Sequence, residues 1–263
     1  MSKDSAPYTT QLQAGLGLID ETKTLLDIWK PGMGTKSLYQ TALKSGRFPT
    51  VTARRLLNIV AECFAPRYLA NGGYPAAHLK LLGPGLAPHE LQQFLLLFTC
   101  RANAILADFV REVYWERYAG GYSEVSNEDA RTFVERGIDD GKTSKRWSET
   151  TVRRVSAYLT GCCADYGLLN GIGKSGRKML SYRMSHKVAA YLAYDLHFKG
   201  IGDNALLSYE DWVLFGMGRE DVLDEMKRLS LKGFVILQAA GEVVKISWKH
   251  QDMEALCYAL AQG

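Results

Sequence analysis

Two groups of side chains in this sequence have the types and spacing that suit contacts with nucleic acid. In the first group, Arg54 and Asn58 lie four residues apart, which places them on one face of a helix. Arginine and asparagine can form paired hydrogen bonds with guanine and adenine edges, whereas lysine and threonine suit phosphate oxygens. The full group, a predicted DNA-facing surface, comprises Lys36, Lys44, Arg47, Thr52, Arg54, Arg55 and Asn58.

The second group combines a helix with the basic hairpin that follows it. The apolar stripe of the helix comprises Val152, Val155, Leu159, Cys162 and Tyr166, in steps of three and four residues. This stripe turns Arg153 and Arg154 outward. The helix suits the major groove of DNA, and the hairpin suits adjacent phosphates or the minor groove. The group comprises Lys145, Arg146, Thr150, Arg153, Arg154, Lys174, Arg177, Lys178 and Arg183.

The charge of the chain is unevenly distributed along its 263 residues, although the net charge is only +4. Between Lys30 and Lys80 there are eight basic residues and one acid, Glu62. Between Lys142 and Lys187 there are ten basic residues and two acids, which leaves a net charge of −11 for the rest of the chain. A solvated basic face is the alternative interpretation of each zone. An ordinary exposed helix alternates its signs, however, so the scarcity of acids favours surfaces that bind polyanions.

The elements that position the first group are predicted from apolar periodicity. The pattern predicts helices over residues 8–29 and 35–45, and then a tight turn at 46–49. Thr50 is predicted to cap a further helix that ends near residue 65. A helix, a turn with glycine and a second helix are typical of a helix-turn-helix, which we place near residues 35–65.

The middle of the chain contains its most irregular composition. Glycine and proline in residues 66–88 predict a long irregular connection. Residues 89–118 are apolar enough to form one central buried helix, which we expect to end at Gly120-Gly121. We place a domain boundary there, between an N-terminal helical domain of residues 1–120 and a C-terminal helical domain of residues 121–263.

The C-terminal half contains two predicted units of a helix followed by a hairpin. In residues 127–184, Asn127 and Ser148 cap two helices, and residues 168–183 form a hairpin, which is the winged variant of helix-turn-helix. Residues 208–248 repeat this layout without the positive charge, so we interpret them as structural or protein-facing. The predicted fold class is mainly α: a multi-helix globular fold with helix-turn-helix or winged-helix subdomains and short β-hairpin wings.

The sequence offers no positive case for an enzyme or a cofactor site. Gly173-Lys174-Ser175 resembles the end of a phosphate-binding loop, but the residue five places before Gly173 is Leu168 rather than glycine. The five histidines are separated and lack metal-ligand spacing. Paired acids lie near helix ends, where capping explains them more simply than catalysis. We therefore expect a non-enzymatic protein without metal or cofactor.

The cysteines and the apolar stretches indicate a cytoplasmic protein. The five cysteines are odd in number, lack C-x-x-C spacing and lie inside apolar helical patterns, as reduced core thiols do. No stretch approaches the roughly 20 apolar residues that a membrane-spanning helix requires. The N-terminus has no signal-peptide pattern.

Five segments together resemble the BrxA family of the BREX phage-exclusion systems, over nearly the whole chain. They are residues 8–26, residues 52–56, Trp147 to Leu169, Trp212 to Phe215, and Ala240-Gly241 with Trp248. The resemblance implies a small, largely helical accessory protein with helix-turn-helix regions that bind duplex DNA. The family is also compared with NusB, an RNA-binding antitermination protein. The chain is longer than other members, and residues 71–88 are where we expect the additional length.

The resemblance also implies partners. These are double-stranded DNA and other BREX proteins: a methyltransferase, a phosphatase-like protein and ATPases. Outside such a complex, we expect a monomer. Two alternatives to duplex DNA binding stay open, an RNA-binding NusB-like adaptor and a protein scaffold of the defence complex without direct nucleic-acid binding. The sequence leaves open the preferred DNA site and whether both basic surfaces bind one duplex.

Overall fold

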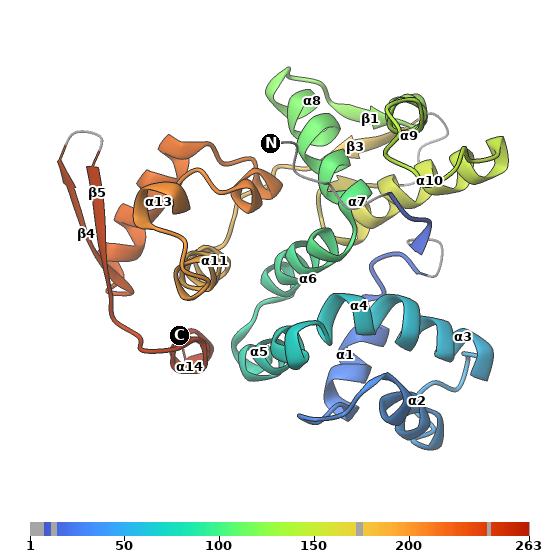
Figure 1. Ribbon diagram of the computed structural model, residues 1–263, viewed down its shortest axis with the longest axis horizontal. Coiled ribbons are helices and arrows are strands. Elements are labelled where there is room, and N and C mark those ends of the chain that lie inside the picture. Colours follow the sequence, from blue (N-terminus) through green and yellow to red (C-terminus); the bar gives the residue numbers. More distant parts are fainter. Residues whose placement is uncertain (1–7, 12–14, 172–175, 241–242, 263) are drawn as a thin grey trace. The chain divides into compact units, whose positions relative to one another are not determined.

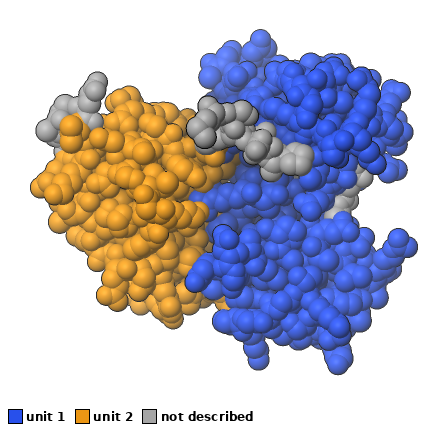
Figure 2. All heavy atoms as spheres, viewed as in Figure 1, with its two compact units in different colours: residues 1–77, 95–181 blue, residues 78–94, 182–263 orange. Residues whose placement is uncertain are grey.

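The chain forms two compact units (Figures 1 and 2). The computed structural model describes residues 8–11, 15–171, 176–240 and 243–262. Unit 1 comprises residues 1–77 and 95–181, and unit 2 comprises residues 78–94 and 182–263. The mainly α fold class is confirmed, because most described residues are helical and the sheets are small and antiparallel. Residue 120, where the sequence predicted a domain boundary, lies inside unit 1.

Unit 1 contains two groups of helices and a three-stranded sheet. Its N-terminal helices are α1 (Ile19–Ile28), α2 (Thr35–Lys44), α3 (Ala53–Asn58), η2 (Ile59–Phe64), α4 (Ala65–Tyr68) and η3 (Asn71–Gly73). Its later elements are α7 (Ala104–Phe109), η5 (Val110–Tyr114), α8 (Trp115–Ala119), β1 (Glu124–Ser126), α9 (Asn127–Asp139), α10 (Glu149–Asp165), β2 (Leu169–Asn170) and β3 (Gly176–Met179). The helices α5 (Tyr74–Leu82) and α6 (Pro88–Ala102) contribute residues to both units.

The helix that follows α2 begins later and extends further than its sequence predicted. The Oγ1 of Thr52 accepts a hydrogen bond from the backbone N of Arg55 at 3.2 Å, so Thr52 rather than Thr50 is the cap. Thr50 instead lies in a turn closed by a hydrogen bond from the N of Val51 to a carbonyl three residues earlier. From α3 the backbone continues through the π-helical η2 and α4 to Tyr68.

The described residues before α1 form an irregular strap, not the predicted helix from residue 8. The helix α1 begins only at Ile19, and Tyr8 packs on α9, where its ring would lie 2.6 Å from a Cβ added to Gly137. The backbone N of Tyr8 donates to the carbonyl of Lys142 at 2.6 Å, and its hydroxyl donates to Asp108 at 2.7 Å. These contacts join Tyr8 to residues distant in the sequence, which local periodicity could not predict.

A buried arginine fastens this strap to the body of unit 1. The Arg67 side chain on α4 donates to the carbonyls of Gly15 and Leu16, both at 3.0 Å, and the residue is only 4% exposed. The next residue, Gly17, donates its backbone N to the carboxylate of Asp165 in α10 at 2.8 Å. Residues 15–17 therefore connect α4 with α10, and buried hydrogen bonds to a charged group make that connection strong.

The predicted irregular connection over residues 66–88 is largely helical, so that prediction was wrong. The helical path breaks at residues 70–73, where Asn71, Gly72 and Gly73 have positive φ angles, and then resumes as α5. Ala76, Leu79 and Leu82 lie three residues apart and are buried. Pro75 occupies the second position of the helix, where a missing N–H costs no hydrogen bond.

The predicted single helix over residues 89–118 is also wrong, because the chain bends by 118° between α6 and the helical run α7–η5–α8. The break is Asn103, whose backbone angles (φ −137°, ψ 95°) are not helical. Within the described ranges no single helix is long and apolar enough to cross a membrane, although this bent pair passes the same test of length and composition.

The sheet of unit 1 joins a strand that the sequence did not reveal to the predicted hairpin. The strand β3 lies between β1 and β2 and is antiparallel to both, with Val125 opposite Arg177. The cap of α9 is Ser126, one residue before the predicted Asn127, and it forms a reciprocal pair of hydrogen bonds with Asp129. The element order is therefore β1–α9–α10–β2–β3.

Unit 2 contains several helices and a hairpin that is longer than the hairpin of unit 1. Its further elements are η4 (Gly83–Gly85), α11 (His186–Phe198), α12 (Asp203–Leu206), η6 (Glu210–Phe215), α13 (Arg219–Leu231), β4 (Val235–Ala240), β5 (Val243–Trp248) and α14 (Met253–Gln262). The helix α13 and the β4–β5 hairpin match the unit predicted over residues 208–248. Trp212 anchors η6, because it is buried and its Nε1 donates to the carbonyl of Leu206 at 2.8 Å.

Candidate nucleic-acid interface

The helix α10 presents predicted basic residues on its exposed face. The helix starts after Ser148, whose Oγ accepts a hydrogen bond from the backbone N of Thr151 at 3.3 Å, as the cap prediction required. The predicted stripe is buried and comprises Val152, Val155, Leu159, Cys162 and Tyr166. The opposite face therefore points outward and carries Thr150, Arg153 and Arg154, which we call the α10 surface.

The two arginines of the α10 surface are unpaired. Neither Arg153 nor Arg154 makes a hydrogen bond or ion pair with any residue that the structure describes. Lys145, in the loop before the helix, is also exposed and makes no such contact with a described residue. An unpaired guanidinium keeps its five N–H donors available for a phosphate or a base edge. The α10 surface is thus an exposed cationic face ready to bind an anion.

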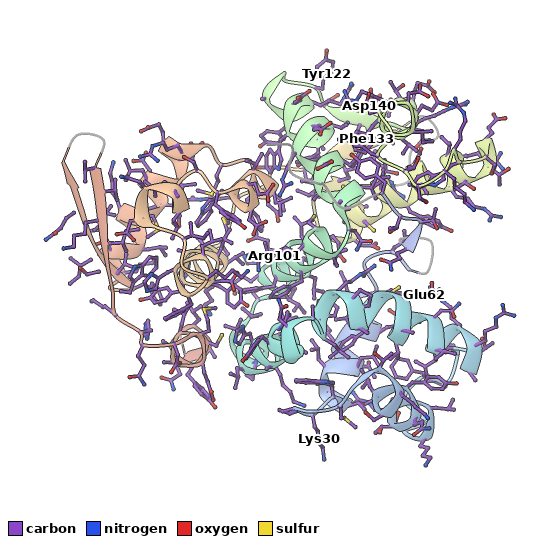
Figure 3. The ribbon with its side chains drawn as sticks, viewed as in Figure 1. Lys30, Glu62, Arg101, Tyr122, Phe133 and Asp140 are labelled. Atoms are coloured by element: carbon purple, nitrogen blue, oxygen red, sulfur yellow. The ribbon has the colours of Figure 1, made fainter. Side chains whose placement is uncertain are left out.

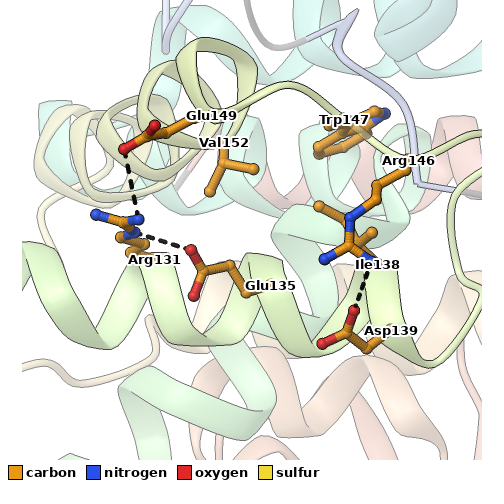
Figure 4. Close-up of a pocket in the computed structure, with 8 residues that line it drawn as sticks. All are labelled: Arg131, Glu135, Ile138, Asp139, Arg146, Trp147, Glu149 and Val152. Atoms are coloured by element: carbon orange, nitrogen blue, oxygen red, sulfur yellow. Dashed lines mark hydrogen bonds and ion pairs between the residues drawn. The ribbon is translucent and has the colours of Figure 1, made fainter.

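Arg146 is in a different situation, beside a cleft of about 450 Å³ between α9 and the start of α10 (Figure 4). Its Nη1 lies 3.2 Å from the carboxylate of Asp139. On the other side of the cleft, Arg131 pairs with Glu135 at 2.9 Å and with Glu149 at 3.7 Å. The other lining residues are Ile138, Trp147 and Val152. Three carboxylates and two guanidinium groups leave this cleft slightly acidic, so it does not suit a phosphate.

The hairpin beside α10 carries less free charge than its sequence suggested. Lys178 is exposed, but it lies directly opposite Glu124 of β1 in the sheet register. Cross-strand pairs of opposite charge attract one another, so Glu124 offsets Lys178. Arg177 is half-buried and donates to the carbonyl of Gly171 at 2.5 Å. Lys174, at the predicted tip, lies outside the described residues.

Arg183 does not belong to the hairpin, and the prediction that placed it there was wrong. The strand β3 ends at Met179, and Arg183 lies in an irregular segment that belongs to unit 2. Its carbonyl accepts a hydrogen bond from Nε2 of Gln93 at 2.8 Å. This contact ties the backbone of residue 183 to the start of α6 within unit 2.

The first predicted surface is only partly exposed. We call the exposed cations Lys36, Lys44 and Arg54 the α2–α3 surface. Of the other predicted residues, Arg55 and Asn58 are half-buried, and Thr52 is exposed but serves as the helix cap.

Two acidic residues lie near this surface, and one of them pairs with a predicted cation. Arg47 pairs with Asp27 of α1 at 2.8 Å, so its charge is offset. Glu62, the one acid of this zone, projects from the side of its helix away from α2, while Lys30 points out of the loop after α1 (Figure 3).

Sequence reasoning missed the acids that neutralise Arg47 and Arg146. Asp27 lies three residues before the first basic zone, and Asp139 lies three residues before the second. Counting charge within each zone excluded both acids. Two signals could have found these acids. One is a charge count that extends a few residues beyond each basic zone. The other is the seven-residue spacing of Asp139 and Arg146 across the turn between two helices.

The reactive side chains of the chain are poorly placed for chemistry. All five cysteines are free and buried, and burial raises the pKa of Cys162 and of Cys257 to about 12. A thiol with so high a pKa stays protonated near neutral pH and is a weak nucleophile. Within the described ranges, no group of three or more His, Cys, Asp or Glu residues is placed to hold a metal ion.

Comparison with known protein families identifies the chain. Residues 6–195 match the family model described as BrxA. The protein belongs to the BrxA family. The family resemblance predicted from the sequence is therefore confirmed. The chain is a protein associated with BREX phage-defence systems.

One solved structure supports the fold. An uncharacterized protein from Magnetospirillum magneticum shares 13% sequence identity with this chain at a TM-score of 0.57, covering 76% of this chain and 96% of that one. Likeness at this level of identity shows the fold alone. No curated protein matches the chain.

The BrxA match does not extend over the whole chain. It ends at residue 195, so the segment from Trp212 to Trp248, which the sequence resemblance included, lies outside it. Residues 71–88, where we expected the additional length, lie inside it. Most of unit 2, from α12 to α14, therefore follows the part of the chain that the family describes.

Proposed function

We propose that this BrxA-family protein binds double-stranded DNA through the α10 surface, as a non-catalytic accessory protein of a BREX system. The observation that carries the proposal is the pair of exposed, unpaired arginines on a helix whose opposite face is buried along its length. Ordinary surface arginines are paired or alternate with acids, as Arg131 and Arg146 do in the neighbouring cleft.

The surrounding elements support a winged helix-turn-helix. In the order β1–α9–α10–β2–β3, α9 packs against α10 and the hairpin follows directly. Such a module inserts its second helix into the major groove, where the N-terminal residues of that helix reach base edges. Thr150, Arg153 and Arg154 all lie in the first two turns of α10. The α2–α3 surface adds a second, smaller group of cations to the same unit.

The chemistry of these groups favours phosphate contacts with some base readout. Arginine forms bidentate hydrogen bonds to guanine or phosphate, and threonine binds phosphate oxygens. Binding should release counterions, so affinity should fall steeply with salt, by about 0.9 log units per log unit of salt for each phosphate neutralised.

The test is a titration of duplex DNA, single-stranded DNA and structured RNA of equal length against the full chain at several salt concentrations. The double variant Arg153→Ala/Arg154→Ala should lose about 1–3 kcal/mol of binding free energy per arginine, and its salt slope should fall by roughly 2. The matched control is Lys227→Ala/Lys232→Ala, which removes two exposed cations at α13 in unit 2. We expect this control to bind like the unmodified chain.

Three outcomes would contradict the proposal. The first is unchanged binding by the Arg153→Ala/Arg154→Ala variant, and the second is an equal loss in the Lys227→Ala/Lys232→Ala control. The third is a strong preference for RNA, which would favour an RNA-binding adaptor. Failure to bind any nucleic acid at physiological salt, with retained capture of another BREX protein, would favour a scaffold.

A further inference from the structure

The β4–β5 hairpin of unit 2 has two edges, and only one of them is protected. At the β5 edge, the backbone N of Val244 donates to Oδ1 of Asn204 at 3.3 Å, and the backbone N of Ile246 donates to Oδ2 of Asp203 at 2.9 Å. Both acceptors belong to α12. Its side chains therefore occupy the positions that a further strand would take beside β5.

These two hydrogen bonds also show which groups of β4 point away from the hairpin. In an antiparallel pair, successive residues alternate between facing the partner and facing outward. Because Ile246 faces outward, the residue opposite it in the register, Leu237, faces outward from the other edge. Ile236 and Gln238, on either side, pair with β5. Within the described chain, Leu237 makes no hydrogen bond that covers its outward N–H and carbonyl.

The composition of β4 makes this open edge unusual. Its six residues, Val-Ile-Leu-Gln-Ala-Ala, include no charge, proline or glycine. Natural proteins commonly protect edge strands with lysine, proline, a bulge or a very short strand. The two edge strands of unit 1 follow that rule, because β1 has three residues and β2 only two. The β4 edge instead combines length, apolar side chains and exposure, since Ile236 is 50% exposed and Gln238 is exposed.

We propose that β4 pairs antiparallel with β4 of a second copy of this chain, about a two-fold axis at Leu237, and so forms a four-stranded sheet. In that register, Leu237 of each copy donates to and accepts from the Leu237 of the other copy, and Ile236 of one lies opposite Gln238 of the other. A strand of this length also suits pairing by strand addition.

The partner is a second copy because the edge is complementary to itself. A two-fold interface requires each surface to match its own copy. In such a pair, a charged residue on the two-fold axis, or like charges at two positions that meet across it, would repel and destabilise the dimer. The β4 strand has no charge, so self-pairing carries no such cost. This inference goes against the monomer that the sequence predicted, and it does not depend on the proposed DNA binding.

The first experiment measures the mass of the full chain in solution over a range of concentrations by sedimentation velocity. We expect a reversible dimer. The variant Leu237→Pro should be monomeric, because proline removes the outward N–H and places its ring where the second strand would lie, while the bonds to β5 stay intact. The matched control Leu237→Val should still dimerise. Thermal unfolding and DNA titration of each variant separate loss of pairing from loss of folding or of DNA binding.

A second pair of variants tests the register without proline. The double variant Ile236→Lys/Gln238→Lys should be monomeric, because two lysines meet two lysines across the axis. The double variant Ile236→Lys/Gln238→Glu should dimerise, because each lysine meets a glutamate. The proposal is overturned if the unmodified chain is monomeric at every soluble concentration, even if it captures a strand of another BREX protein. Equal dimerisation of both double variants would overturn it as well.

Discussion

Two modules in this protein share one order of elements and differ in what their surfaces offer. In unit 1, α10 is followed by the β2–β3 hairpin, and in unit 2, α13 is followed by the β4–β5 hairpin. The cations Arg153 and Arg154 of α10 are unpaired, whereas Lys227 and Arg228 of α13 pair with acids three residues earlier, at 2.8 and 2.9 Å.

The hairpins of the two modules differ in how well their strand edges are protected. In unit 1 both edge strands, β1 and β2, are short, and the central strand β3 is paired on both sides. In unit 2 the hairpin is longer and one edge is open. The comparison teaches that the same sequence of elements can serve anion binding in one place and strand pairing in another, because side chains and edges rather than the fold decide the function.

The largest expected effect comes from breaking the sheet of unit 1 at Gly176. A Cβ there would lie 2.7 Å from the carbonyl oxygen of Val125 and 2.9 Å from the Cα of Ser126, and backbone atoms cannot move aside easily. We expect Gly176→Val to lower the free energy of unfolding by about 1–3 kcal/mol. Denaturant unfolding, with hydrogen exchange at β1 and β3, measures the loss.

The control for this variant lies at the corresponding module of unit 2. A Cβ at Gly218, before α13, would meet only a carboxylate oxygen of Asp221 at 3.5 Å. Gly218→Ala should therefore change stability by less than about 1 kcal/mol. Equal losses in the two variants would mean that the two modules are packed alike, against the comparison.

A smaller effect should follow from exchanging the helix caps of the two modules. The cap of α10 is Ser148, whereas the cap of α13 is Gly218, which has no side chain to accept a hydrogen bond. Ser148→Ala should lower the free energy of unfolding by about 1 kcal/mol, and Gly218→Ser should raise it by a few tenths of that amount. Thermal unfolding of both variants measures the difference. A stabilised Ser148→Ala variant would contradict the role of Ser148.

The smallest effect should appear on mild acidification. All five histidines lie in unit 2, and burial lowers the pKa of His78, His186 and His250. Each is therefore neutral in the folded state at a pH where the unfolded chain binds a proton. Their contribution to stability is complete above about pH 6.5 and is lost as the pH falls below that value.

Hydrogen exchange between pH 7.5 and 5 measures this difference between the units. Protection in α11 and α14 should fall before protection in α9 and α10. The variant His78→Gln, which removes a ring whose Nδ1 lies 2.8 Å from the hydroxyl of Tyr191, should weaken the pH dependence of unit 2. Simultaneous loss of protection in both units would argue against a histidine origin.

The sequence predicted α10 and its surface because everything that determines them is local. The cap at Ser148 and the buried stripe from Val152 to Tyr166 lie within one helix, so the direction of Arg153 follows from helical geometry alone. The same reasoning predicted α2, α13 and the two hairpins.

The wrong predictions arose where tertiary packing, which the local sequence does not encode, decides the structure. Apolar residues continue on both sides of Asn103, so the break between α6 and α7 leaves no gap in the hydrophobic pattern. The strand β1 has only three residues, too few to show alternation. Gly72 and Gly73 directly before α5, and Pro75 inside it, obscured its regular apolar spacing. The neutralisation of Arg47 depends on Asp27, twenty residues away on another helix.

The strap held by Arg67 has a consequence for the order in which unit 1 can assemble during synthesis. Residues 15–17 leave the ribosome early, but the carboxylate that receives the N–H of Gly17 belongs to Asp165, and Leu16 packs against Gly161. The strap cannot reach its final place until α10 has been made. The contacts that join the start of the chain to α4 and α10 therefore form late in translation, after α10 has emerged.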